Sequence, residues 1–228
     1  MTEDDSLRPL AAALEHLTAA RHSCRAFLPD PVPHGTIERI VRLAGRAASW
    51  CNAQPWQLII TEGAATERFR AALMAQAPAD PHFPWPTAYH GPFGERRRAC
   101  GYQLYEAVGI ARDDAPARAA QAMENFRLFG APHVALLTSD SDLGTYGAID
   151  CGGFIANFLL AAHSLGVASI AQAALSLHSD FIARHFALPA GRRFICGISF
   201  GYEDASHPAN AFRTARAPLD EVAVFVEA

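Results

Sequence analysis

Polar and positively charged side chains gather near the N-terminus, where Arg21, His22, Ser23 and Arg25 fall within one short segment. They follow directly on a stretch with helical periodicity, so a helix is expected to end beside them. In an extended segment Arg21, Ser23 and Arg25 share one face, which can hold a phosphate together with the polar edge of a ring. A solvated surface turn is the alternative that this cluster by itself leaves open.

A second polar segment runs over residues 49–55. Asn52 and Gln54 present amide groups two residues apart, and Pro55 closes the loop before a predicted strand. Such a loop can hydrogen-bond to the hydroxyl groups and ring heteroatoms of a cofactor. An Asx-type turn leading into a strand explains the same residues without any ligand.

Three further segments could complete a binding site. Arg127 stands just before residues 129–132 and a predicted strand, so it can meet an anion at the mouth of a sheet, although surface ion pairing is commoner for a lone arginine. Small side chains fill residues 166–174, where we predict a loop that lets a flat ring approach the backbone. Arg213 and Arg216 can clamp a phosphate from the far side, although each alone is more typical of a solvated arginine.

The chain contains no lysine, so all 19 of its Lys-or-Arg side chains are arginine. A Schiff-base mechanism is therefore excluded, and any side-chain cation that binds an anion must be Arg or His. The net charge of −4 is too small to imply a nucleic-acid partner, and we interpret the basic run at residues 96–98 as a solvated helix face. The five cysteines are dispersed and form no CxxC, which argues against a disulfide framework and a zinc site.

The N-terminus is acidic and lacks the layout of a signal peptide, and no apolar run approaches the ~18 residues that span a membrane. The sequence also lacks a nucleophile elbow, an HExxH motif, a Walker loop and a GxGxxG fingerprint. We therefore expect a cytoplasmic protein with no membrane partner, no hydrolytic site and no Rossmann nicotinamide site.

Helices outnumber strands in the predicted pattern, and the strands are widely spaced. The expected helices span residues 7–20, a stretch after a Thr36 N-cap, 95–108, 116–129, 150–165 and 179–186. The expected strands span residues 56–61, 133–138 and 193–200, followed by an extended tail at 208–216 and an apolar element at 219–226. This pattern predicts a single α+β domain of three layers over residues 1–228.

Two segments have more than one explanation. Five prolines within residues 78–94 predict an ordered excursion, whose aromatic side chains either line a substrate pocket or pack an insertion. The helix at residues 150–165 is apolar nearly all round. It must therefore be buried centrally or against a partner chain.

Four motifs occur in the order and spacing of the FMN-dependent nitroreductase family. The opening motif, Arg21-His22-Ser23-x-Arg25-x-Phe27, and the second, at residues 48–56, resemble those of the family. Residues 127–132 resemble the third motif and residues 216–221 the last. The run at 171–175 is most similar to the branch that includes nitrobenzoate and nitrobenzene reductases. The resemblance covers almost the whole chain.

The resemblance implies a central, mostly antiparallel sheet flanked by helices, in an intertwined homodimer with FMN held at the subunit interface. It places three residues at the FMN phosphate: Arg21, Ser23 and Arg216. It places five more along the ribityl chain and ring: His22, Arg25, Ser49, Asn52 and Gln54. Arg127 is implied to lie near the N1–C2=O edge of the isoalloxazine, and backbone N–H groups around Gln172 and Ala173 to face N5.

A cation near N1 stabilises reduced FMN, which is anionic there, and in a chain without lysine an arginine is the group to supply it. The family implies that NADH or NADPH and a small aromatic acceptor, such as a nitroaromatic or a quinone, share one site above the flavin in ping-pong order. No protein acid or base is then required. The aromatic residues expected to shape the acceptor pocket are Trp50, Trp85, Phe93, Tyr102 and Tyr105.

Two other hypotheses stay open. Relatives with the same fold include reductive dehalogenases of halotyrosines and flavin-fragmenting enzymes, but the halotyrosine type uses a lid with Glu, Tyr and Lys that a chain without lysine cannot supply. A flavin-binding or sensing protein without turnover belongs to a different class. It predicts bound FMN that NAD(P)H fails to reduce.

Overall fold

The computed structural model describes residues 8–79 and 81–226. Its strands are β1 (Gln57–Thr61), β2 (His133–Asp140), β3 (Ala168–Gln172) and β4 (Arg192–Gly201). Its α-helices are α1 (Arg8–Ala20), α2 (His34–Ala44), α3 (Ala64–Met74), α4 (Gly91–Ala107), α5 (Ala115–Met123), α6 (Gly144–Ser164), α7 (Ser179–His185) and α8 (Leu219–Val222). Short 3₁₀ turns lie at η1 (Trp50–Asn52), η2 (Leu128–Gly130), η3 (Ser141–Leu143), η4 (Ala173–His178) and η5 (Pro208–Asn210).

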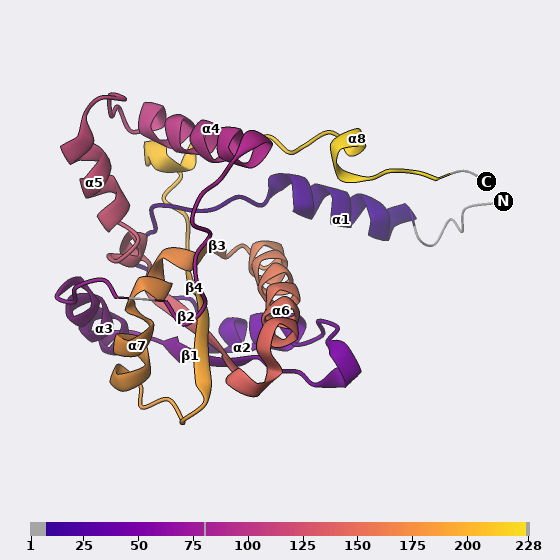
Figure 1. The fold of residues 1–228 in the computed structure, drawn as a ribbon, viewed down its shortest axis with the longest axis vertical. Coiled ribbons are helices and arrows are strands. Elements are labelled where there is room, and N and C mark those ends of the chain that lie inside the picture. The colour runs from indigo at the N-terminus through magenta and orange to yellow at the C-terminus, as the bar shows by residue number, and fades with distance from the viewer. Residues whose placement is uncertain (1–7, 80, 227–228) are drawn as a thin grey trace.

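The strands form a sheet in the order β1-β2-β4-β3, and every neighbouring pair is antiparallel. Alternate residues of a strand face opposite layers. Ala135 and Leu137 of β2 pack with α2 and α6, whereas Val134 and Leu136 pack with α3 and α7. The sheet is therefore the middle of three layers, with α2 and α6 on one side and α3 and α7 on the other (Figure 1). The predicted α+β class with an antiparallel central sheet is confirmed.

Helix α6 is the longest helix among the described residues and buries Cys151, Phe154 and Phe158 against the sheet layer. It starts at Gly144, six residues before the predicted start, without a side-chain N-cap. It directly follows the η3 turn, which the Asp140 carboxylate caps through the Asp142 N–H. Residues 141–164 are long and apolar enough to cross a membrane by those two measures alone, contrary to the expectation from the sequence. The core helix of a soluble domain meets the same two measures.

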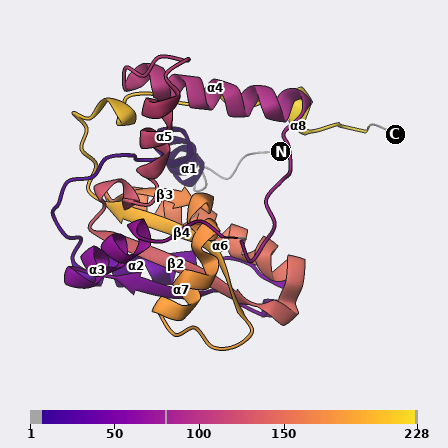
Figure 2. The same ribbon diagram turned by 60° about the vertical axis from the view of Figure 1, so that its left-hand side comes forward.

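Four helices stand outside this layered body. Helices α1, α5 and α8 bury no residue, and α4 buries only Gly94 among those that the structure describes. Figures 1 and 2 show α8 near one end of α4, and an Arg96–Glu221 ion pair joins the two helices. These outer elements place the N-terminal and C-terminal segments next to each other.

The predicted loop at residues 166–174 is wrong, because Ala168–Gln172 is the strand β3. It pairs antiparallel with residues 197–201 of β4 and buries Ile170. Strand propensities favour bulky and β-branched side chains, so a run of small residues hides a strand. Here the pairing with β4 satisfies the backbone hydrogen bonds that a buried segment must make.

Other boundaries also differ. No side chain caps α2, which begins at His34 directly after Pro33, so the Thr36 cap is wrong. The helix predicted to reach residue 129 ends at Met123. Leu128 and Phe129 adopt φ values of 57° and 53°, which rule out a helix through residue 129. Helix α3 was not predicted, and α4 begins within the proline-rich excursion, with Pro92 in its first turn.

A buried histidine links strand β2 to the segment before α2. The His133 Nε2 accepts a hydrogen bond from the Val32 N–H at 2.9 Å, and its ring stacks on Phe200 with centroids 5.1 Å apart. Burial lowers the pKa of His133 below its ordinary value of 6.5. The folded protein thus holds this ring neutral, while the unfolded chain binds a proton there as the pH falls through 6.5.

We expect stability to be fully present above pH 6.5 and to be lost progressively at lower pH, since protonation removes the acceptor of the Val32 N–H. The variant His133→Leu should be less stable at pH 8 by about 1–3 kcal/mol, because it leaves that donor unpaired. Its melting temperature should then fall less steeply than that of the wild type below pH 6.5. An equally steep fall in thermal melts from pH 8 to pH 5 would assign the acid sensitivity to other groups.

Candidate active site

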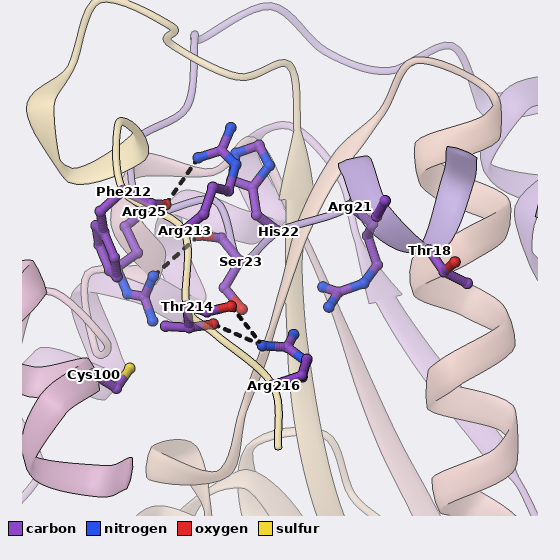
Figure 3. A pocket seen from close by; sticks show the side chains of 11 residues that line it. Thr18, Arg21, His22, Ser23, Arg25, Cys100, Phe212, Arg213, Thr214 and Arg216 are labelled. Carbon is purple, nitrogen blue, oxygen red and sulfur yellow. Dashed lines mark hydrogen bonds between the residues drawn. The ribbon is translucent and has the colours of Figure 1, made fainter. Parts of the chain in front are cut away.

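A cavity of about 220 Å³ lies between the N-terminal segment and the C-terminal tail. Its lining residues are Thr18, Ala19, Arg21, His22, Ser23, Arg25, Cys100, Phe212, Arg213, Thr214 and Arg216 (Figure 3). Four of these side chains are arginines, and none is a carboxylate. We call this the arginine cavity. A cavity so rich in guanidinium groups is suited to an anion with several oxygen atoms.

Backbone contacts bring the two segments of the arginine cavity together. Ser23 forms an isolated parallel bridge with Ser169 of β3, and the Cys24 N–H donates to the Ser169 carbonyl at 3.2 Å. The buried Asn210 side chain accepts from the Arg25 N–H at 2.6 Å and donates to the Ala26 carbonyl at 2.9 Å. Asn210 therefore fixes the tail to the N-terminal segment. Nothing in the sequence singled it out, because a lone Asn in a tail is a common turn residue.

The positive charges in the arginine cavity repel one another. Burial lowers the pKa of Arg21, and the nearby Arg216 guanidinium lowers it further. Burial likewise lowers the pKa of Arg25, whose guanidinium lies 5.3 Å from the centroid of the Phe212 ring. Arginine remains protonated in proteins at neutral pH, so the repulsion is not relieved by loss of a proton. A bound anion relieves it.

The structure brings six of the residues singled out in the sequence together in this cavity: Arg21, His22, Ser23, Arg25, Arg213 and Arg216. The His22 ring is held in place, because Nε2 lies 2.9 Å from a Glu203 carboxylate oxygen and Nδ1 lies 3.2 Å from the Ala20 carbonyl oxygen. Arg216 donates to the Thr214 hydroxyl at 2.9 Å. Thr214 and Phe212 also line the cavity, although neither carried a sequence signal.

The far end of β3 holds a second group of predicted residues. From Ser169 to Ala173 the strand advances by about 13 Å. The Gln172 amide is buried and donates to the Asn125 carbonyl at 2.8 Å, which ties this end of β3 to the segment that carries Arg127. Arg127 itself donates to the Glu124 carboxylate at 2.7 Å. The sequence did not indicate Asn125 as a positioning residue.

The loop with Ser49, Asn52 and Gln54 does not line the arginine cavity. Asn52 and Gln54 are exposed and Ser49 is half-buried. The loop is stabilised by its own hydrogen bonds: the Gln54 N–H donates to the Ser49 hydroxyl at 3.0 Å, and the Gln54 amide donates to the Asn52 side chain at 3.1 Å. Asn52 and Gln54 adopt φ values of 56° and 48°, in the left-handed region. Next to them Trp50 packs edge-on against Tyr146 of α6. One chain therefore presents the predicted residues as separate groups.

Of the aromatic residues expected to shape an acceptor pocket, only Trp85 lines a cavity together with Ala173. Tyr102 packs beneath the Arg112 guanidinium at 4.4 Å, and Phe93 is exposed on α4. Trp50 lines a different cavity beside Asp150. Within one chain these side chains do not form a common pocket.

Comparison with known proteins gives one consistent result. Residues 18–202 match the sequence profile of the nitroreductase family. The chain is 37% identical to the nitroreductase NfnB of Mycolicibacterium smegmatis over 95% of this chain and 94% of that protein. It is 31% identical to a 4-nitrobenzoate reductase of Nocardioides sp., over 98% of this chain and 96% of that protein.

A solved structure agrees with these relatives. The crystal structure of the FMN-dependent nitroreductase NfnB from Mycobacterium smegmatis in complex with NADPH superposes with a TM-score of 0.90 at 36% identity. The match covers 96% of this chain and 100% of the other chain. From its sequence profile, its relatives and its three-layer α+β fold, this chain belongs to the nitroreductase family.

Proposed function

We propose that this protein is an FMN-dependent oxidoreductase that uses NADH or NADPH to reduce nitroaromatic, quinone or related acceptors. The observation that carries the proposal is the arginine cavity, which lies at one end of β3 while Gln172 and Ala173 lie at the other. Relatives described as FMN-dependent, bound to NADPH and named for nitrobenzoate reduction support the same activity.

The residues present fit FMN. The arginine cavity supplies planar guanidinium donors and a serine hydroxyl for a phosphate, with no carboxylate among its lining residues to repel it. Strand β3 runs away from that cavity along the edge of the sheet. A cofactor with a phosphate at one end and a ring at the other can therefore lie extended beside this strand. The small Ala173 side chain leaves room for a ring to approach the backbone.

When bound, FMN supplies the chemistry, since it accepts a hydride from the nicotinamide and passes reducing equivalents to the acceptor. The chain's own residues bind and orient. Arg21, Ser23 and Arg216 would hold the phosphate. Arg127, whose guanidinium is paired with the Glu124 carboxylate, would lie near the pyrimidine edge of the ring. Backbone N–H groups at Gln172 and Ala173 would face the reacting edge. The Gln172–Asn125 hydrogen bond holds these two parts of the site in register.

We further propose that the protein acts as a homodimer in the cytoplasm. Helix α1, the C-terminal segment and the outward side of α6 expose large apolar side chains that a partner would cover: Leu10, Leu14, Tyr146, Ile149, Leu219, Val224 and Phe225. Gly152 and Gly153 of α6 face open space, so a second helix can approach this surface closely. The loop with Asn52 and Gln54 then completes the FMN site of the partner subunit.

The test is an anaerobic visible spectrum of the purified protein before and after addition of NADH or NADPH. We expect an oxidised-flavin spectrum that bleaches with a nicotinamide and returns on addition of 4-nitrobenzoate or a quinone. The donor that bleaches it faster identifies the preferred nicotinamide. A bound flavin that stays oxidised would favour a sensing protein without turnover. A protein that binds no FMN even after reconstitution would contradict the proposal.

A further inference from the structure

A second cavity, of about 400 Å³, lies beside Ala173. Residues 85–89 of the proline-rich excursion form one wall, and Ala173 and Ala174 of η4 form another. Arg97 of α4 is the only charged side chain among its lining residues that the structure describes. We call this the excursion cavity.

The wall of the excursion cavity is fixed to the body of the protein. The Trp85 indole N–H donates to the Ser176 hydroxyl at 2.7 Å, and that hydroxyl donates to the Ala173 carbonyl at 2.7 Å. The His82 ring lies 3.0 Å from the Asp180 carboxylate and accepts from the Phe194 N–H at 2.9 Å. The sequence left two explanations open for the aromatic side chains of the excursion, packing or lining a pocket. Both apply, because His82 packs the excursion against the body of the protein and Trp85 lines a cavity.

Arg97 differs from its neighbours in the basic run at residues 96–98 because it lines the excursion cavity. Arg96 is paired with Glu221, whereas neither Arg97 nor Arg98 makes an ion pair within residues 8–79 and 81–226. Its guanidinium lies 5.7 Å from the centroid of the Tyr89 ring. A Cβ on Gly94 would lie 2.6 Å from the Tyr89 carbonyl oxygen, so glycine at that position allows α4 to close on Tyr89. This close approach holds the Arg97 charge at the edge of an aromatic wall.

We propose that Arg97 binds the carboxylate of an aromatic acceptor that enters the excursion cavity. Trp85 and Tyr89 offer flat apolar faces to the ring of such a molecule, and the guanidinium matches a carboxylate with two parallel hydrogen bonds. The residue would thus select acceptors with an anionic ring substituent over neutral ones. This inference rests on the proposed function, because it assumes that the flavin ring lies against Ala173.

The test compares Arg97→Gln with Arg98→Gln, which removes the same charge from an exposed position of the same helix outside the cavity lining. Benzoate and its neutral analogue benzamide are titrated into each oxidised holoenzyme and followed by the flavin absorbance. The KM values for 4-nitrobenzoate and for nitrobenzene are measured in parallel. The titration needs no turnover, so it separates this inference from the proposed reaction.

We expect Arg97→Gln to weaken benzoate binding and to raise the KM for 4-nitrobenzoate about tenfold, with benzamide and nitrobenzene unaffected. Arg97→Lys keeps the charge but loses the paired donors, so its benzoate affinity should lie between those of the wild type and Arg97→Gln. Arg98→Gln should behave like the wild type. An equal loss for benzoate and benzamide would overturn the proposal, because it would indicate a structural effect. Unchanged benzoate binding together with a raised KM for NADPH or NADH would also overturn it, since the anion would then belong to the donor.

Discussion

Replacing Arg21 and Arg216 together by glutamine is expected to give a folded, colourless protein that has lost its FMN. Hydrogen bonds to charged groups contribute about 1.5–3 kcal/mol each, so each arginine should change FMN affinity about 10- to 100-fold. The double variant should bind about 10²- to 10⁴-fold more weakly, as measured by fluorescence titration of the apoprotein with FMN. Arg42→Gln is the matched control, because Arg42 is exposed on α2 and pairs only with Glu38 among the described residues.

The same variant carries a second signature, in the stability of the apoprotein. Arg216 lowers the pKa of Arg21, which means that the two positive charges repel each other when no anion is bound. Removing both charges should therefore leave the melting temperature of the apoprotein unchanged or raise it, whereas FMN should no longer raise it further. A marked fall in the apoprotein melting temperature would instead identify these arginines as structural. Unchanged FMN affinity would place the phosphate elsewhere.

Heterodimers with separated lesions should recover one FMN site from two inactive parents. One subunit carries Arg21→Gln and Arg216→Gln, and the other carries Asn52→Gly and Gln54→Gly. Glycine removes the side chains of Asn52 and Gln54 and still accepts their left-handed backbone. If each site combines the arginines of one subunit with the loop of its partner, this heterodimer retains about one FMN per dimer, because a two-fold interface gives two equivalent sites.

The control places all four substitutions on one subunit and pairs it with a wild-type subunit. If the sites are shared between subunits, one site of this heterodimer lacks the arginines and the other lacks the loop. This heterodimer should therefore bind no FMN. A site built within a single chain predicts the reverse result for the two heterodimers. Differently tagged subunits, purified by both tags, allow the bound flavin to be counted in each, and the comparison does not depend on how strongly either lesion affects folding.

The sequence by itself determined which side chains can bind an anion. The absence of lysine leaves only Arg or His as a side-chain cation for that purpose. The spacing of Arg21, Ser23 and Arg25 indicated a shared face, with a solvated surface turn as the alternative, and the structure places the three in one cavity. The long apolar run at residues 193–200 predicted the central strand β4, which is buried on both faces as such runs usually are. These features are local, since they depend on residue type and on short repeats along the chain.

Tertiary structure decided what local patterns do not encode. Strand β3 contains small residues with weak strand propensity and forms because the edge of β4 pairs with it. Asn210 positions the site by donating to the Ala26 carbonyl, far away in the sequence. The Asn125 carbonyl accepts from the Gln172 amide, on a segment that only the fold brings near. The separation of the Asn52 loop from the arginine cavity likewise depends on the packing of α6, because distances between segments arise from the fold and not from spacing along the chain.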